Sequence, residues 1–108
     1  MVILKKKELE MILQKLRPIP DPDPSLEQYQ TPSDIGADLL FQAYSRGDIA
    51  GKKIVEPGCG NGLLLLGAGL LGAVSLTGFD TDSEAVGVAE DNLLSLSVAG
   101  FNQNVRFF

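Results

Sequence analysis

A short apolar segment near the middle of the chain runs into small and polar residues that could bind a ligand. It spans residues 54–62, with the sequence IVEPGCGNG, so an acid is followed by three glycines at alternate positions. Glycine lets the backbone turn sharply and lets a ligand lie against it without a Cβ in the way. A helix starting there offers unpaired N–H groups and a partial positive charge to that ligand. The pattern predicts a binding turn around Glu56, Gly58 and Gly60.

A second acid, Asp80, closes the next apolar segment, 18 residues after Gly62. An acid in that place can accept hydrogen bonds from the two hydroxyls of a ribose. The carboxyl ends of neighbouring parallel strands lie at one edge of a sheet. The glycine turn and Asp80 together therefore predict a nucleoside-bearing cofactor lying across the ends of two adjacent strands.

A dinucleotide is the alternative cofactor, but its Gly-x-Gly-x-x-Gly fingerprint fits poorly. The turn itself fails the pattern because position 63 is Leu. Residues 67–72 (GAGLLG) match it literally, but the following residues look like a strand, whereas the fingerprint must open a helix. Glu56 also suits an ammonium group better than a pyrophosphate. A nucleotide- or NAD-binding half-domain stays open as the rival interpretation.

The elements that position these residues alternate between strand and helix. We expect strands at residues 53–56, 73–79 and 105–108, with helices between them at about 62–70 and 83–96. This alternation predicts an α/β fold, a Rossmann-like parallel sheet with flanking helices and right-handed connections. Upstream, a helix is expected to begin with Thr31 as its cap and Pro32 at its first position, and to end at Gly47. Its predicted buried face is Ile35, Leu39, Ala43 and Tyr44.

The N-terminal third of the chain divides into a helix and a connector. Residues 1–17 predict an amphipathic helix, ended by Pro18, with apolar residues at helical spacing: Leu9, Ile12, Leu13 and Leu16. Residues 18–30 carry four of the six prolines, which predicts an extended connector rather than part of the core.

Composition excludes several classes of function. The chain has no histidine and one cysteine, which argues against conventional zinc or iron–sulfur sites, histidine acid–base catalysis and an internal disulfide. We therefore expect no metal and a reducing, cytoplasmic setting. The longest Gly/apolar run, residues 62–74, is shorter than the roughly 18–20 residues that span a bilayer, so no membrane is expected.

Charge is unevenly distributed along the chain. Residues 1–17 hold five bases and two acids, whereas the remainder holds four bases and twelve acids. Phosphate contacts supply most non-specific affinity for nucleic acids. Any nucleic-acid contact is therefore expected to use the basic N-terminus or residues outside this chain.

The turn resembles the first motif of the class I S-adenosylmethionine-dependent methyltransferases, which reads strand, acid, x-Gly-x-Gly-x-Gly. The resemblance implies that Glu56 contacts the methionine ammonium of S-adenosylmethionine and that Gly58 and Gly60 admit the cofactor. Cys59, inside the turn, is included in the cofactor-binding set, although its side chain is expected to serve packing.

The same resemblance assigns the residues after the second strand. It implies that Asp80 binds the ribose hydroxyls and that Thr81, next along, lies beside the adenine. Asp80 as only a turn or helix-start acid is the simpler alternative.

A second block narrows the resemblance. Residues 26–32 (LEQYQTP) resemble a segment of the methyltransferase-like enzymes that modify adenine in small-subunit ribosomal RNA, and of their archaeal relatives. In those enzymes the residues matching Gln28 and Thr31 line the methionine end of the cofactor. The resemblance covers nearly the whole chain and implies methylation of the exocyclic amine of adenine in RNA.

The catalytic Asn/Asp-Pro-Pro-aromatic motif of those enzymes follows a fourth strand, and this chain holds no Pro-Pro dipeptide. We therefore assign no catalytic residue, interpret residues 31–108 as a partial, N-terminal half of the domain, and expect the chain alone to be inactive. The family's strand order, 3-2-1-4-5, would leave the first strand on an open edge, where self-association is expected. The resemblance also implies a small activator protein on the outer edge of the third strand. A degenerate domain kept for protein interaction is the non-enzyme alternative.

Overall fold

The computed structural model describes residues 5–20 and 30–108 of the chain. The elements follow in the order α1 (Lys6–Gln14), α2 (Ser33–Ser45), β1 (Lys53–Pro57), α3 (Leu63–Leu70), β2 (Ser75–Phe79), α4 (Ser83–Val98) and β3 (Asn104–Phe107). The predicted alternation of strand and helix from β1 onward is confirmed, with bounds that differ by one or two residues.

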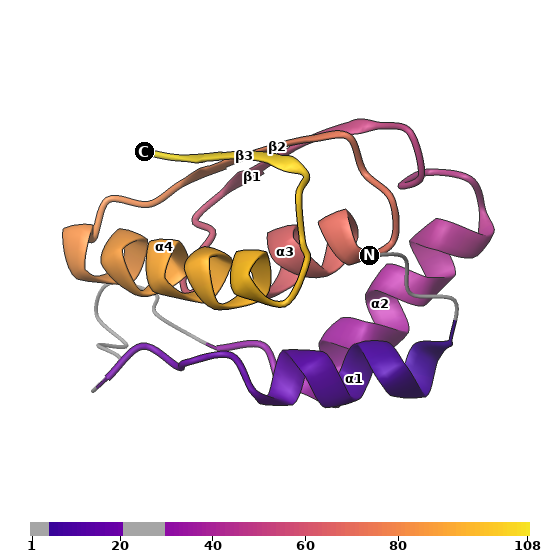
Figure 1. Cartoon of the computed structure of the whole chain (residues 1–108), viewed down its shortest axis with the longest axis horizontal. Helices are drawn as coiled ribbons and strands as arrows, with labels where there is room; N and C mark the ends of the chain where they lie inside the picture. Colours follow the sequence, from indigo (N-terminus) through magenta and orange to yellow (C-terminus); the bar gives the residue numbers. More distant parts are fainter. Residues whose placement is uncertain (1–4, 21–29) are drawn as a thin grey trace.

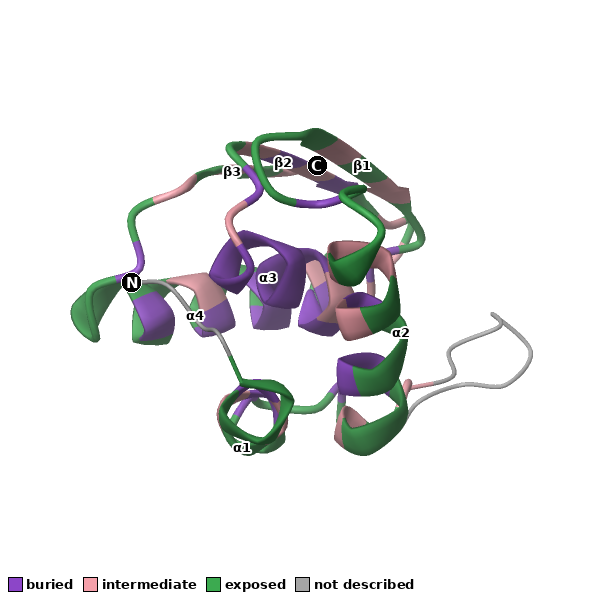
Figure 2. Cartoon of the chain, turned by 90° about the vertical axis from the view of Figure 1, so that its right-hand side faces the viewer, coloured by how far each residue is buried: buried purple, intermediate pink, exposed green. Residues whose placement is uncertain are grey.

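The three strands form one parallel sheet in the order β1-β2-β3. Glu56 in β1 lies beside Gly78 in β2, which lies beside Phe107 in β3. Within the described residues β1 pairs only with β2, so it lies at an edge of the sheet, as the strand order predicted. Figures 1 and 2 show all four helices on the same side of the sheet.

The opposite face of the sheet carries exposed apolar side chains. Val55 is 61% exposed, Phe79 43% and Phe108 60%. The rings of Phe79 and Phe108 stack with centroids 5.4 Å apart. Within residues 5–20 and 30–108, helices therefore flank one face only.

Helix α3 lies at the centre of the core, between the sheet and the remaining helices (Figure 2). Its residues Leu65, Leu66 and Leu70 are at most 1% exposed. Leu9 and Leu13 of α1 belong to the same buried cluster, so α1 is amphipathic, but it covers only Lys6–Gln14 of the helix expected over residues 1–17. No helix in the described part of the chain is long and apolar enough to cross a bilayer.

The predicted buried face of α2 is wrong at Ile35 and Leu39, whereas Ala43 and Tyr44 are partly buried against the core as predicted. Ile35 and Leu39 are 50% and 53% exposed, whereas Gly36, Ala37 and Leu40 are buried. A Cβ on Gly36 would stand 2.7 Å from Leu63 Cδ2, so α2 approaches α3 through its small residues. The close approach of the two helices at Gly36 therefore buries Gly36, Ala37 and Leu40 and leaves Ile35 and Leu39 exposed.

The start of α2 also differs from the prediction. The helix begins at Ser33, Pro32 occupies the preceding cap position, and no side chain caps the N-terminus. Thr31 therefore precedes the helix instead of capping it. The C-terminal prediction is confirmed, because Gly47 follows the helix with φ +82°.

The glycines of residues 67–72 serve packing. The run lies in α3 and the turn after it, so it opens no helix and forms no phosphate loop. A Cβ on Gly67 would stand 2.4 Å from Leu40 Cδ1, and one on Gly69 would stand 2.6 Å from Phe101 Cζ.

Gly69→Ala should lower the free energy of unfolding by about 1–3 kcal/mol, because its methyl group overfills the core against Phe101 and Leu76. Gly87→Ala is the matched control, since a Cβ on this α4 glycine meets nothing within 4 Å. The control should stabilise the chain by about 0.5–1 kcal/mol through helix propensity. Urea unfolding followed by circular dichroism measures both, and equal effects would contradict the packing assignment.

Candidate cofactor-binding site

The glycine turn connects β1 to α3 at the carboxyl edge of the sheet. Gly58, Gly60 and Gly62 have φ values of +67°, +57° and +85°, a region that residues with a Cβ rarely adopt. Gly62 caps α3, and its carbonyl accepts the N–H of Leu66 at 2.8 Å. The sharp turn predicted from the alternate glycines is therefore confirmed.

The turn also leaves space beside the backbone. Gly58 is exposed, and a Cβ there would meet nothing within 4 Å. A Cβ on Gly60 would meet only Ile19 Cδ1, at 3.6 Å. A ligand can thus approach the backbone at Gly58 closely.

Asp80 joins the glycine turn to the end of β2. Gly60 N–H donates to Asp80 Oδ2 at 2.9 Å, and Asp82 N–H donates to Oδ1 at 2.9 Å. One residue earlier, the N–H of Cys59 donates to the carbonyl of Phe79 at 2.9 Å. Each carboxylate oxygen has two lone pairs, so Asp80 holds the turn and can still accept from a ligand hydroxyl.

Glu56 carries a buried carboxylate oxygen with no partner in the described structure. The unpaired atom is Oε1. Burial raises the pKa of Glu56 to about 7, the charge of Asp80 adds to the shift, and a hydrogen bond from the Leu65 backbone partly offsets it. An unsatisfied buried acceptor is unfavourable. A cationic donor would therefore be stabilised here.

Glu56 lines a small hollow that lies between the glycine turn and residues of the N-terminal segment. Of the predicted site residues, the described structure brings five together around it: Thr31, Glu56, Gly58, Cys59 and Gly60. The hollow measures about 50 Å³, well below the roughly 300–1,000 Å³ of a complete ligand pocket. Its size suits one end of a cofactor, with the remainder lying along the open edge.

Cys59 is buried, and its thiol is unreactive. Its Sγ would stand 2.9 Å from a Cβ on Gly78, so the thiol packs against the β2 backbone. Burial, followed by the nearby acids Glu56 and Asp80, raises the pKa of the Cys59 thiol to about 11. The thiol is therefore protonated at neutral pH, in agreement with the packing role expected for it.

Two predicted residues that the structure describes, Asp80 and Thr81, are not among those that line the hollow. Thr81 is exposed and follows Asp80 directly, outside the lining. Gln28 lies outside the described residues. No group of three or more potential metal ligands occurs within residues 5–20 and 30–108.

Sequence reasoning missed part of the site wall. Ile19, assigned to a connector outside the core, is only 6% exposed and lines the hollow. The Gln30 amide holds it, accepting from Ile19 N–H at 3.2 Å and donating to Ile19 C=O at 3.3 Å. Asn61 and Asn92 were also missed. Asn92 could have been found from its spacing, four residues from both Val88 and Leu96 on the buried side of α4.

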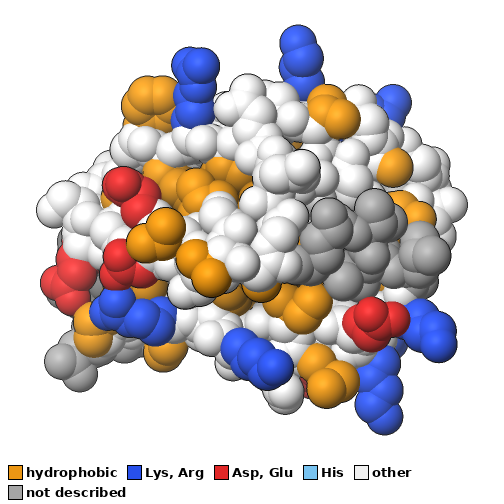
Figure 3. Space-filling model, viewed as in Figure 1, with side chains coloured by type: hydrophobic (Ala, Val, Ile, Leu, Met, Phe, Trp, Pro, Cys, Tyr) orange, Lys and Arg blue, Asp and Glu red, His pale blue; other side chains and the backbone are white. Residues whose placement is uncertain are grey.

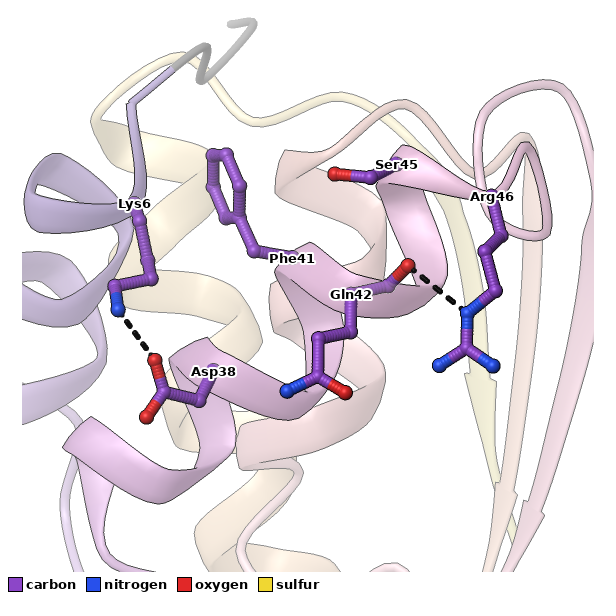
Figure 4. Close-up of a pocket in the computed structure, with 6 residues that line it drawn as sticks. All are labelled: Lys6, Asp38, Phe41, Gln42, Ser45 and Arg46. Carbon is purple, nitrogen blue, oxygen red and sulfur yellow. Dashed lines mark hydrogen bonds and ion pairs between the residues drawn. The ribbon is translucent and has the colours of Figure 1, made fainter.

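A second hollow lies between α1 and α2 and contains none of the predicted site residues (Figure 4). Lys6 and Asp38 point toward each other there as an exposed ion pair. Arg46 Nε donates to the carbonyl of Gln42 at 3.3 Å. This hollow is open, and its cations Lys6 and Arg46 already have partners on α2.

Comparison with known proteins agrees with this geometry. A family model described as ribosomal protein L11 methyltransferase (PrmA) matches residues 36–105. The rRNA N(6)-adenosine-methyltransferase METTL5 of Danio rerio is 36% identical over 91 residues, covering 83% of this chain and 44% of its own length. The chain thus spans about half the length of the curated relatives it matches.

Solved structures show the same arrangement. A Pyrococcus horikoshii protein, described as a candidate RNA methyltransferase, superposes with a TM-score of 0.84 and 40% identity, covering 99% of this chain and 51% of its own. The magnesium protoporphyrin IX methyltransferase of Synechocystis, solved with S-adenosylmethionine, shares the fold at a TM-score of 0.56 and 21% identity, covering 66% and 34%. With the family match over residues 36–105, the chain belongs to the class I S-adenosylmethionine-dependent methyltransferases, in the family of the ribosomal protein L11 methyltransferases.

Proposed function

We propose that this chain binds S-adenosylmethionine at the carboxyl edge of its sheet and forms the cofactor half of an RNA methyltransferase. The observation that carries the proposal is the unpaired, buried Oε1 of Glu56 beside an open glycine turn. The turn is held by Asp80, whose carboxylate can accept further hydrogen bonds. The site therefore offers a hydrogen-bond acceptor for an ammonium group at Glu56 and further acceptors for hydroxyl groups at Asp80.

Each site residue has a distinct role in this proposal. Glu56 accepts a hydrogen bond from the ammonium group, and Asp80 accepts hydrogen bonds from the ribose hydroxyls. The backbone at Gly58 lies against the cofactor. Thr81 stands beside the adenine, and Gln28 with Thr31 contacts the methionine end. Bound S-adenosylmethionine supplies a methyl group on a positively charged sulfur, and the chain's own residues only bind and orient it.

RNA is the proposed substrate of the complete enzyme, with the exocyclic amine of adenine as the methylated group. METTL5 of Danio rerio, an rRNA N(6)-adenosine-methyltransferase, supports this choice, as does the match to the Pyrococcus horikoshii protein. On the face shown in Figure 3, lysine and arginine side chains stand around the rim and form no single patch. The RNA contacts of this chain are proposed to involve its basic N-terminal helix.

Asp80→Ala should weaken binding of S-adenosylhomocysteine by at least about tenfold, because it removes the ribose acceptors and the bond to Gly60. Isothermal titration calorimetry measures the change, with Glu90→Ala, an exposed acid on α4, as the control. The parent chain should bind S-adenosylhomocysteine and should not bind NAD. It should transfer no tritium from labelled S-adenosylmethionine to ribosomal RNA. Binding to NAD alone would favour the dinucleotide alternative, and no binding to either would favour a degenerate interaction domain.

Glu56 should make cofactor binding and stability depend on pH. Its pKa of about 7 lies above the ordinary 4.5, so the free chain is stabilised by protonation and loses that stability as pH rises through 7. An ammonium ligand favours the charged carboxylate, so affinity for S-adenosylhomocysteine should rise from pH 6 to pH 8 with release of a proton. Calorimetry in buffers of different ionisation enthalpy measures that proton. Glu56→Gln should bind weakly with a flat profile, and an unchanged pH dependence in this variant would contradict the assignment.

We also propose that the two strand edges serve as contact surfaces, β1 for a second copy and the outer edge of β3 for a small activator protein. An apolar groove of about 300 Å³, lined in part by Ile49, Ile54 and Leu64, lies beside β1 and supports the first contact. Light scattering over a dilution series should show an oligomer that dissociates, and Ile54→Asp should favour the monomer. A parent chain that stays monomeric at every concentration would exclude the β1 contact.

A further inference from the structure

Three distant segments of the chain meet at a cluster of buried amide groups. Asn92 of α4 is 2% exposed, and Asn61 of the glycine turn is 8% exposed. Both contact the backbone of Arg17, which follows α1. The cluster joins the N-terminal segment, the glycine turn and α4.

Every polar atom of the Asn92 side chain has a partner. Its Oδ1 accepts from Arg17 N–H at 2.7 Å, and its Nδ2 donates to the carbonyls of Arg17 and Asn61, both at 3.0 Å. Asn61 Nδ2 donates to the same Arg17 carbonyl at 2.9 Å, while its Oδ1 accepts from Leu63 N–H at 3.2 Å. The Arg17 backbone is thus held by hydrogen bonds from two sides.

Holding Arg17 places the next residues against the hollow. Ile19, two residues on, is buried over Gly60 and is bonded through both backbone groups to the side chain of Gln30. Ile19 and Gln30 line the same hollow as Glu56. Asn92 itself is absent from the lining, so it acts on the hollow through the groups that it holds, the backbone of Arg17 and the carbonyl of Asn61.

A second polar contact between Arg17 and α4 is weaker. Arg17 and Asp91 form an ion pair at 2.6 Å, but their side chains are 60% and 58% exposed. Exposed pairs contribute little because water screens them. Removing Asn92, by contrast, leaves the Arg17 N–H without its side-chain acceptor inside a buried cluster.

We propose that Asn92 is a positioning residue of the cofactor site, which docks the Arg17–Ile19 backbone against the glycine turn and so shapes the end of the hollow that contains Glu56. The inference rests on the proposed function, because that end is where the amino-acid part of the cofactor binds. In the proposed binding mode the adenosine part lies toward Asp80, which is not among the residues that line the hollow. Asn92 should therefore affect the binding of the amino-acid part of the ligand and not that of the adenosine part.

The test compares two ligands on the full chain. S-adenosylhomocysteine carries the amino-acid end, and 5′-methylthioadenosine carries the same adenosine without it. Asn92→Ala should weaken S-adenosylhomocysteine by about tenfold while leaving methylthioadenosine within about twofold of the parent, by calorimetry. Leu96→Ala, one turn further along α4 and in the main core, is the control for general destabilisation and should not change the ratio of the two affinities.

The possible results distinguish a failure of this inference from a failure of the proposed function. If the parent binds neither ligand, the proposed function fails. If the parent binds both and Asn92→Ala weakens them equally, or weakens neither, the positioning role is overturned. If Asn92→Ala does not give a native circular dichroism spectrum, Asn92→Ser, which keeps a small polar group, is compared by the same affinity ratio. An unchanged ratio in that variant likewise overturns the role.

Discussion

The hydrogen bonds between Asp80 and the glycine turn are the interaction on which this part of the molecule depends. One carboxylate oxygen holds Gly60, and the other holds the backbone at the start of α4. The turn is thereby fixed against the end of β2, and the N-terminus of α3 is placed beside it. Because the three glycines adopt left-handed conformations, the turn keeps this shape without side chains filling its concave side.

Glu56 illustrates how a binding site differs from the rest of a core. Each polar side-chain atom of the buried residues Asn61 and Asn92 has a partner, as expected for groups removed from water, whereas Gln103 has a buried oxygen, Oε1, without one. Glu56 retains one buried oxygen without a partner and a pKa near neutrality. Such an arrangement is unfavourable for the free chain and becomes favourable when a cation arrives, which is why perturbed acids concentrate at functional sites.

Prediction from sequence succeeded where the backbone itself imposes a constraint. The glycine turn, the strands around it and the end of α2 at Gly47 were predicted correctly, since positive φ and hydrophobic runs leave few alternatives. It failed where two elements had to approach each other. The buried side of α2 includes Gly36, Ala37 and Leu40 instead of Ile35 and Leu39, and glycines allow the close contact with α3, Gly36 beside Leu63 and Gly67 beside Leu40.

The amino-acid sequence by itself determined the order of elements, the shape of the glycine turn and the two acids beside it, because these follow from local conformation and from spacing. Tertiary structure alone decided that Ile19 and Gln30 form a wall of the hollow and that Asn92 holds Arg17 beside it. Those contacts join residues 11 to 75 positions apart. Their hydrogen-bond partners are backbone groups, which every residue carries, so no residue type in the sequence identifies them.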